Sequence, residues 1–541
     1  MLHSLLSLPS LITIAGAVML GYGARRTSRR SPVASLLGFV LVVASLPMHV
    51  SATHGLLAGG SSLLLSAAAG LGIVALLLNR DSGGAKGGRQ FIVLALASLV
   101  GSVLLFFGSS LFGGSSIHHG APHATEDAGL SASQTQAVET ANAVETVATA
   151  DGESLLVELG PDDNIDEILP LIAEYGGRAE RAFPTVSLTD DEDLSQVFMV
   201  SGVKKDLLLK LIDLLRKQIE DVDNVEINEP IGLEPVDVET TTDKFSSPLL
   251  TNDPLASQQW SLGVARVDAA HRILKDITPV RKAVVAILDT GVDAAHEDIV
   301  SSFLKESPAT SDIHGHGTHC AGIAGAATNN GKGMASLNWD GKFVEVASYA
   351  ALGDTGMGTV ETMAQAIIDA TTDGADVISM SLGEFSLFPV KVVTDAVEFA
   401  QKRGVIVVAA AGNSNRDAKM HIPSNIDGVI AVAAVDENNR KASFSNTNTS
   451  LSRPIAAPGV NILSLEPNGK YGKKSGTSMA TPLVSGLIGV MRAINPELTA
   501  EQVYTILEET GRSGPDAAKV GSTIQADAAV RVAAGNIVVR S

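Results

Sequence analysis

The sequence contains a single cysteine, Cys320, among 541 residues. One cysteine cannot form an intramolecular disulfide, so stability outside the cytoplasm has to come from the apolar core and from any bound metal. The chain also lacks an excess of basic residues beyond residue 115. The first 115 residues hold seven Lys or Arg and one acidic residue, a net charge of +6, so with a total of −20 the remainder carries −26. Phosphate binding needs clustered Lys and Arg, and we therefore expect no nucleic-acid partner.

Residues 1–115 are dominated by four apolar stretches of about 20 residues, which predict four transmembrane helices. A cleaved signal peptide is the alternative for the first stretch, but no basic segment precedes it and three more apolar stretches follow. All seven basic residues lie in the loops 24–30 and 79–90, which the positive-inside rule assigns to the cytoplasm. We predict an all-α, multi-pass anchor in the lipid bilayer, with the rest of the chain extracytoplasmic. The four stretches are residues 4–23, 32–50, 55–78 and 91–113.

Residues 116–152 are small and polar and contain no Lys or Arg, which predicts a flexible stalk. Residues 153–232 then alternate short strand patterns with amphipathic helical ones, and this order predicts a small α+β, ferredoxin-like domain. The domain has no Cys and no His, so on its own it would be interpreted as a binding module. We expect strands at 154–160, 196–202 and 222–230, and helices at 164–177 and 204–220.

Residues 281–540 predict an α/β domain with a doubly wound parallel sheet. Apolar runs of about six residues, such as AVVAILD at 283–289, alternate with helical stretches, which is typical of strands buried on both faces. Sheets of this kind bind ligands at the carboxyl ends of their strands. Asp289, Ser381 and Asn413 all lie at the ends of such runs, so we expect them at one edge of the sheet.

Asp289 begins an Asp-Thr-Gly triplet, and a second such triplet begins at Asp354. Two triplets would be typical of an aspartic protease, in which two carboxylates about 3 Å apart share a proton. The second triplet, however, lies in a glycine-rich loop that enters a helix, and the β-rich lobes of that class are missing. We interpret Asp354 as a turn and helix-entry residue.

Three histidines, His314, His316 and His319, have the spacing of a metallo-β-lactamase-type metal site. Thr318 stands where those enzymes carry an aspartate, and no later Asp or His cluster completes a two-metal site. We therefore expect no catalytic metal.

The third interpretation of Asp289 is an Asp-His-Ser triad. Ser478 lies in KKSGTSMATP (473–482), where a loop of small polar residues becomes an apolar helix. A helix N-terminus presents free N–H groups and the positive end of its dipole to a developing oxyanion. The small neighbours Gly476 and Ala480 would let a substrate backbone come close.

Five segments of the chain resemble the signature blocks of subtilisin-like serine proteases (subtilases) and occur in the same order. The resemblance extends from about residue 252 to about residue 515. The resemblance implies that Asp289 orients His316, that His316 is the general base, and that Ser478 is the nucleophile that forms an acyl-enzyme. It further implies that Asn413 donates a hydrogen bond to the oxyanion. The segments are AILDTGVDAAHEDI, HGHGTHCAGIAG, SMSLG, VVAAAGNS and SGTSMATP.

The same resemblance assigns the substrate-binding residues. Ser381, Leu382 and Gly383 match the strand that pairs with the substrate backbone. His421 falls at the floor of the pocket for the residue on the acyl side of the scissile bond, where many members have glycine. The specificity of the family for that residue therefore cannot be transferred to this chain.

A structural calcium ion is also implied. Asp253, Asp298 and Asn330 match side-chain ligands of the strong calcium site in thermitase-like subtilases. Hard oxygen ligands of this kind suit Ca²⁺.

The resemblance also implies a zymogen. Residues 153–232 resemble the family's propeptide, which acts as an intramolecular chaperone and inhibitor. Residues 233–251 would then form a linker that contains the autocleavage site, and residues 252–541 the catalytic domain. We predict a membrane-anchored, self-processing serine endopeptidase that acts on polypeptides and binds its own propeptide. The alternative is a catalytically latent membrane scaffold whose prodomain stays in the cleft.

Overall fold

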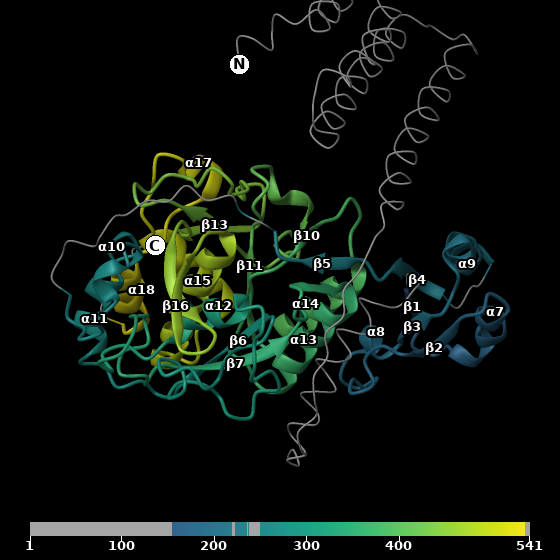
Figure 1. Cartoon of the computed structure of the whole chain (residues 1–541). Coiled ribbons are helices and arrows are strands. Elements are labelled where there is room, and N and C mark those ends of the chain that lie inside the picture. Colours follow the sequence, from purple (N-terminus) through teal and green to yellow (C-terminus); the bar gives the residue numbers. More distant parts are fainter. Residues whose placement is uncertain (1–153, 219–221, 235, 237–248, 536–541) are drawn as a thin grey trace, which may run out of the picture. The chain divides into compact units, whose positions relative to one another are not determined.

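The computed structural model describes residues 154–218, 222–234, 236 and 249–535 (Figure 1). The predicted membrane spans within residues 1–115 and the predicted stalk at 116–152 lie outside these residues. Among the described residues, one helix, α15 (Thr477–Ile494), is long and apolar enough to cross a membrane. Its apolar window is 89% buried inside the protein, as in the core helix of a globular domain.

A six-stranded parallel sheet forms the centre of the larger part of the chain, in the order β14-β13-β11-β9-β6-β7. The sheet is doubly wound, because β7 adds to one side of β6 and β9 to the other. A crevice for ligands forms outside the carboxyl ends of the strands at such a switch point. The strands are β6 (Ala283–Asp289), β7 (Val344–Ala350), β9 (Val377–Met380), β11 (Ile406–Ala410), β13 (Ile430–Val435) and β14 (Arg453–Pro458).

Alternate residues of β6 pack into two different cores, as the two-residue period of a strand requires. Val285 and Ile287 belong to a core with α11, α12, α15 and α18, whereas Ala286 and Leu288 belong to a core with α13 and α14. Helices therefore cover both faces of the sheet, which explains its near-continuous apolar strands. The helices are α11 (Val267–Leu274), α12 (His316–Gly325), α13 (Val360–Thr372), α14 (Lys391–Lys402) and α18 (Ala526–Ala533).

Residues 155–227 form a smaller α+β unit with a four-stranded antiparallel sheet in the order β2-β3-β1-β4. Helix α7 follows β1 and helix α9 follows β3, which is the β-α-β-β-α-β order of ferredoxin-like units. The elements are β1 (Leu155–Leu159), α7 (Leu169–Glu174), β2 (Arg178–Arg181), β3 (Val197–Ser201), α9 (Lys205–Gln218) and β4 (Val222–Ile227).

The helix predicted over 164–177 is shorter than expected. A 3₁₀ turn (Ile165–Glu167) precedes α7, which has a proline in its first turn. Pro170 has no N–H to donate and would clash with a preceding helical turn, so it starts a helix but does not continue one.

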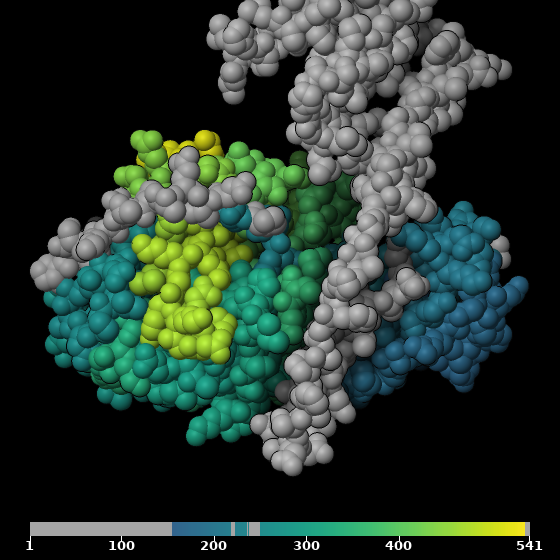
Figure 2. All heavy atoms as spheres, in the orientation of Figure 1, coloured from purple at the N-terminus to yellow at the C-terminus, as the bar shows by residue number. Residues whose placement is uncertain are grey.

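Short strand pairs complete the fold, and one of them covers α12. Ser464 Oγ of the β15–β16 hairpin donates to His319 O at 2.7 Å. A Cβ on Gly322 would lie 2.4 Å from the same Oγ, so only glycine fits beneath the hairpin, which Figure 2 shows in yellow-green on one face. The remaining elements are β5 (Pro230–Gly232), β8 (Met357–Thr359), β10 (Glu384–Phe385), β12 (His421–Ile422), β15 (Ile462–Glu466), β16 (Lys470–Lys474), α8 (Glu192–Ser195), α10 (Ser261–Val264), α16 (Ala500–Thr510) and α17 (Ala517–Val520).

Candidate active site

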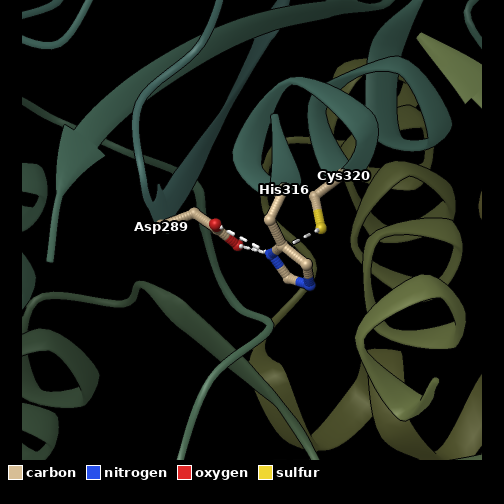
Figure 3. Close-up of side chains that lie close together, drawn as sticks. All are labelled: Asp289, His316 and Cys320. Carbon is tan, nitrogen blue, oxygen red and sulfur yellow. Dashed lines mark hydrogen bonds and ion pairs between the residues drawn. The ribbon is translucent and has the colours of Figure 1, made fainter. Parts of the chain in front are cut away.

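Asp289 is the last residue of β6 and His316 is the first residue of α12, and Figure 3 shows their side chains facing each other. His316 Nδ1 is 2.8 Å from Asp289 Oδ1 and 2.9 Å from Oδ2. Both residues are buried, Asp289 completely. Because the carboxylate can only accept, Nδ1 carries the proton of this hydrogen bond. The second ring nitrogen, Nε2, lies on the side away from Asp289 (Figure 3).

The carboxylate also controls the charge of the ring. Burial lowers the pKa of His316, but the negative charge of Asp289 and its hydrogen bond outweigh burial, so the pKa lies well above its usual value. Cys320, one turn further along α12, is fully buried, and burial raises the pKa of its thiol. Its Sγ is 3.8 Å from His316 Nδ1 and 3.5 Å from Ser478 O. Cys320 therefore contacts both of the residues predicted to exchange a proton.

The three histidines with the spacing of a metal site, His314, His316 and His319, do not point toward a common centre. His314 is exposed, whereas His319 is fully buried with its Nε2 3.3 Å from Gly472 O. Burial also lowers the pKa of His319 well below its usual value, which favours the neutral ring. Within the described ranges, one group of three His, Cys, Asp or Glu side chains lies close enough to hold a metal ion, and it consists of Asp289, His316 and Cys320.

The second Asp-Thr-Gly triplet lies in a different environment from the first. Asp354 is exposed in the turn between β7 and β8, whereas Asp289 is completely buried against His316. A shared-proton pair needs two carboxylates at close range in the same surroundings. The geometry therefore gives Asp289 a histidine as its partner.

Ser478 is the second residue of α15 and is almost fully buried. Its Oγ donates to Ser381 O at 3.0 Å, and Ser381 Oγ donates in return to Ser478 O at 2.8 Å. Among the hydrogen bonds of the described residues, none joins Ser478 Oγ to His316. Catalytic hydrogen bonds of this kind are often long before substrate binds.

Asn413 lies in the loop after β11, with its side chain held in one orientation. Its Oδ1 accepts hydrogen bonds from Thr477 N and Thr477 Oγ1, both at 2.9 Å. Nδ2 is thereby left to donate, and it donates to Glu234 O at 3.3 Å. A Cβ placed on Gly476 would be 3.6 Å from both Asn413 Nδ2 and Ser478 Cβ, so the amide and the serine flank one small space. A carbonyl oxygen in this space can accept a hydrogen bond from Nδ2.

A segment of the same chain lies along the predicted substrate strand, residues 381–383. Gly383 N donates to Gly232 O at 3.2 Å, and the two glycines form an antiparallel bridge. On the other side, β5 pairs with β8, and Leu233 N donates to Gly356 O at 3.3 Å. Leu382, which precedes the paired Gly383, is buried. Residues 230–234 thus run between two strands, as an added strand does in β-augmentation.

Sequence reasoning missed a buried carboxylate, Asp312, that connects the segments of the aspartate and the histidine. Its Oδ1 accepts from Thr290 Oγ1 at 2.9 Å and from Gly315 N at 2.8 Å, and its Oδ2 accepts from Thr318 N at 2.8 Å and Thr318 Oγ1 at 2.7 Å. Burial raises the pKa of Asp312, with these hydrogen bonds lowering it only in part and the charge of Asp289 raising it further. Its place four residues before His316 is the sequence signal that could have identified it.

Asn446 was missed as well, and it supports the loop of Asn413. Its Oδ1 accepts from Ser414 N at 3.1 Å and Arg416 N at 2.9 Å, while its Nδ2 donates to Ala411 O at 2.8 Å. Both ends of its amide are therefore used to hold the loop. No motif in the sequence distinguishes this asparagine from its neighbours.

The three predicted calcium ligands lie together beside the loop 328–335. Asp253 accepts from Asn329 N at 2.8 Å and Asn330 N at 3.0 Å, and Asp298 accepts from Asn330 Nδ2 at 2.8 Å and Met334 N at 2.8 Å. Both carboxylates are buried. Burial raises the pKa of Asp298, hydrogen bonds lower it in part, and the charge of Asp253 raises it again. This oxygen-rich donor set fits a hard cation, which would offset two buried negative charges.

Known proteins are similar to this chain in sequence. A family model described as the subtilase family matches residues 281–534. An alkaline protease from Shouchella clausii is 36% identical over 317 residues, 58% of this chain and 77% of that protein. Subtilisin Savinase from Lederbergia lenta is 36% identical over 280 residues, 51% of this chain and 99% of that protein. Thermitase from Thermoactinomyces vulgaris is 37% identical over 247 residues, 44% of this chain and 84% of that protein. Since the similarity spans most of each relative, this chain belongs to the subtilase family and is a serine endopeptidase.

Proposed function

We propose that Asp289, His316 and Ser478 form the catalytic triad of this endopeptidase and that Asn413 is the side-chain donor to the oxyanion. The contact of both Asp289 oxygens with His316 Nδ1, at 2.8 and 2.9 Å, is the observation that carries this proposal. A carboxylate at Nδ1 holds the ring in the tautomer whose Nε2 can accept a proton, which is what a general base requires.

The reaction then proceeds by acyl transfer. Ser478 Oγ attacks the carbonyl carbon of the scissile peptide bond and gives its proton to His316 Nε2. Asn413 Nδ2 and the free N–H groups at the start of α15 stabilise the negative charge on the carbonyl oxygen. The C–N bond breaks as His316 returns the proton to the leaving amine, which leaves an ester on Ser478. A water molecule, deprotonated by His316, attacks this ester and releases the acid and the free serine.

Covalent labelling of the full chain with a fluorophosphonate tests this assignment. Such a reagent forms a bond with an activated serine, so we expect labelling of the wild-type chain and none of Ser478→Ala. Ser485→Ala is the matched control, because Ser485 is a buried serine of the same helix that bonds Ser379 Oγ at 2.9 Å. Labelling that survives in Ser478→Ala would refute the triad, and inhibition by pepstatin without labelling would favour the aspartic alternative.

We further propose that the small α+β unit is an inhibitory propeptide and that the chain is a self-processing zymogen. Contacts at the start of α14 support this. Glu226 accepts hydrogen bonds from Lys391 N at 3.0 Å and Val392 N at 3.1 Å. The N-cap residue of α14, Val390, supplies no side-chain cap, so the carboxylate of the small unit takes that place. A carboxylate there satisfies free N–H groups and interacts favourably with the helix dipole.

Contacts at the start of α13 point the same way. Asn228 Oδ1 accepts from Glu361 N and Glu229 O accepts from Val360 N, both at 3.0 Å. From there, residues 230–234 continue into the cleft as far as Asn413. A segment in this position excludes a substrate from the same strands, which is how a propeptide inhibits.

Mass spectrometry of the purified full chain tests self-processing. The wild-type chain should lose an N-terminal portion and the Ser478→Ala chain should keep it. Glu226→Gln should weaken inhibition by the small unit, whereas Glu229→Gln is the control, because the Glu229 side chain is exposed. A wild-type chain that stays intact and unlabelled by fluorophosphonate would instead support the alternative, a catalytically latent scaffold.

We also propose that Asp253, Asp298 and Asn330 hold a structural calcium ion, with backbone carbonyls of the loop 328–335 as further ligands. Oxygen donors from two buried carboxylates and an amide support Ca²⁺ over a softer metal. Ca²⁺ should raise the unfolding temperature of the Ser478→Ala chain and a chelator should lower it. Asp298→Asn should abolish this response, whereas Asp293→Asn should retain it, and a response that survives Asp298→Asn would refute the site.

Finally, we propose that residues 1–115 anchor the enzyme in a membrane and that the catalytic domain lies outside the cytoplasm. The basic loops 24–30 and 79–90 support this orientation. A reporter enzyme fused after residue 116 should be active on the extracytoplasmic side, and activity only in the cytoplasm would refute the orientation.

A further inference from the structure

The residue whose carbonyl lies at Asn413 is Glu234, and its side chain enters a pocket of its own. Glu234 O accepts from Asn413 Nδ2 at 3.3 Å, so Glu234 takes the position of the acyl-side residue of a scissile bond. Its carboxylate accepts hydrogen bonds from Asn413 N and from Ser414 Oγ, the latter at 3.4 Å. Glu234 Oε1 also lies 3.6 Å from Nε2 of His421. The chain has thus placed an acidic side chain over a histidine at the site that determines specificity.

The imidazole of His421 is built into the walls of this pocket. The residue is 3% exposed and begins β12, which pairs with β10 just beyond the substrate strand. A Cβ on Gly383 would lie 2.5 Å from His421 Cε1, and a Cβ on Gly412 would lie 2.8 Å from Nε2. The ring therefore fills the space between the substrate strand and the loop of Asn413, where two glycines leave room for it.

The hydrogen bonds of His421 determine which ring nitrogen can bind a ligand. Ser424 Oγ has one proton, and it donates this proton to His421 O at 2.9 Å. Nδ1, which is 3.2 Å from the same Oγ, must therefore donate to it. Nε2 is left as the nitrogen that faces the pocket, and it has no hydrogen-bond partner within hydrogen-bond distance. With Nδ1 already donating, Nε2 can face the Glu234 carboxylate favourably only when it carries a second proton, so the 3.6 Å approach of Glu234 Oε1 to Nε2 is the geometry of an ion pair with an imidazolium.

The charge state of the bound carboxylate agrees with this arrangement. Burial raises the pKa of Glu234, but interactions with His421, Asn413 N and Ser414 outweigh burial and lower the pKa below its usual value. The pocket therefore stabilises the ionised form of the side chain.

We propose that His421 makes this endopeptidase specific for an acidic residue, glutamate above all, on the acyl side of the bond that it cleaves. The inference rests on the proposed function and assigns its substrate class. Glutamine lacks the charge, and an apolar residue would leave Nε2 without an ion-pair partner and Asn413 N without its side-chain acceptor. A lysine would meet the imidazolium with a charge of the same sign. Aspartate is one methylene shorter and reaches the ring less well.

Peptide substrates for the processed full-length enzyme test the proposal. We would use acetyl-Ile-Gly-Leu-Xaa-aminomethylcoumarin, the chain's own residues 231–233 followed by Glu, Gln, Asp, Leu or Lys. A hydrogen bond to a charged group is stronger than a neutral one, so kcat/KM for Glu should exceed that for Gln by roughly ten- to a hundredfold. His421→Gly should remove this ratio and favour Leu. The control His314→Gln should keep the ratio while changing the rates for Glu and Gln alike, because the His314 ring lies beside His316 and the site of Leu233, not at Glu234.

Equal rates for Glu and Gln, or a Glu preference that survives His421→Gly, would overturn the inference. Labelling of Ser478 is scored separately, so a labelled enzyme without Glu preference refutes this proposal and leaves the proposed function intact. A second measurement needs no turnover. In the full-length Ser478→Ala chain, Glu234→Gln should lower the unfolding temperature by about 2–4 °C, and it should have little effect once His421→Gln is also present. Equal shifts in both backgrounds would refute a direct interaction between the two side chains.

Discussion

Asp312→Asn is the substitution that best tests how the aspartate and the histidine are held in register. Asp312 contacts neither the substrate segment nor the ring of His316. Its Oδ1 is bonded by Thr290, the neighbour of Asp289, and by Gly315 N just before α12, while its Oδ2 takes both bonds from Thr318. The carboxylate therefore joins the end of β6 to the first turn of α12. We infer that Asp312 positions these two segments and takes no direct part in the reaction.

The expected loss in the free energy of unfolding follows from the number of hydrogen-bond acceptors that the side chain offers. Asparagine keeps the shape of the side chain but has one acceptor oxygen, so two of the four hydrogen bonds are lost and its NH₂ faces other donors. Two hydrogen bonds to a charged group are worth about 3–6 kcal/mol. Burial raises the pKa of Asp312, which means that the carboxylate itself is costly to bury and that its removal returns part of this free energy. We expect a loss of about 2–3 kcal/mol in the free energy of unfolding.

Activity should fall because the segments that carry Asp289 and His316 of the proposed triad can shift against each other. A displacement of about 1 Å can cost 10²-fold in rate, so we expect kcat to fall by about ten- to a hundredfold with little change in KM. Denaturant unfolding and peptide hydrolysis measure the two effects. Asp293→Asn is the control, since Asp293 lies on the same loop, is half-buried and bonds Ala295 N and Asn468 N outside the triad. An Asp312→Asn enzyme with unchanged kcat, or one that differs from the control only in stability, would refute the positioning role.

Three further predictions concern pH and charge. His316 must be neutral to act as the base, and its pKa is raised. As pH falls, kcat/KM should therefore begin to drop at a higher pH than an ordinary histidine would give, and an acid limb at or below the ordinary histidine pKa would contradict this. Asp289→Asn removes the largest of the interactions that raise the pKa of His316, so its residual activity should show an acid limb at lower pH, and an unmoved limb would mean that another group sets it. Burial raises the pKa of both Glu158 and Glu361 to about 7, so the folded Ser478→Ala chain binds more protons than the unfolded one and should lose stability as pH rises through about 7. Glu158→Gln should remove up to about 3 kcal/mol of this pH dependence, measured by denaturant unfolding between pH 5 and pH 8, and an unchanged dependence would refute it.

The strands that can be predicted from the sequence are those that are apolar along their whole length. β6, β9, β11 and β13 all coincide with apolar runs, because helices cover both faces of the sheet there. The edge strands are different. β7 contains Glu345 and two hydroxyl residues, and β14 begins with Arg453 and Pro454, so neither reads as a buried run. A parallel edge strand has one neighbour and tolerates polar residues and proline, which hides it from a pattern of hydrophobicity.

The residues of the candidate site also differ in how far the sequence predicts them. Asp289 lies at a strand end and Ser478 at a helix start, and the sequence indicates both by itself, whereas His316 is assigned by the resemblance to subtilases. Asp312 and Asn446 act through hydrogen bonds to backbone groups that loops bring close, and such partners depend on how several loops fold together. The same holds for the pocket. The resemblance to subtilases places His421 at the floor of the pocket, but its acidic ligand is apparent only from the position of Glu234 in three dimensions.

Two helix N-termini meet in this cleft, and they act on charges of opposite sign. His316 begins α12, where the positive end of the dipole disfavours an imidazolium by about 0.3–1 kcal/mol, up to about 2 when partly buried. The reaction nevertheless requires the ring to hold a proton, so a negative charge has to outweigh both the dipole and burial. Asp289, fully buried at 2.8 Å, does so, as the raised pKa of His316 indicates. At the start of α15 the charge that develops is negative, and the dipole favours it without help. Among the described residues, a buried carboxylate is hydrogen-bonded to His316 and none is hydrogen-bonded to Ser478, which is the distribution of charge that the proposed reaction requires.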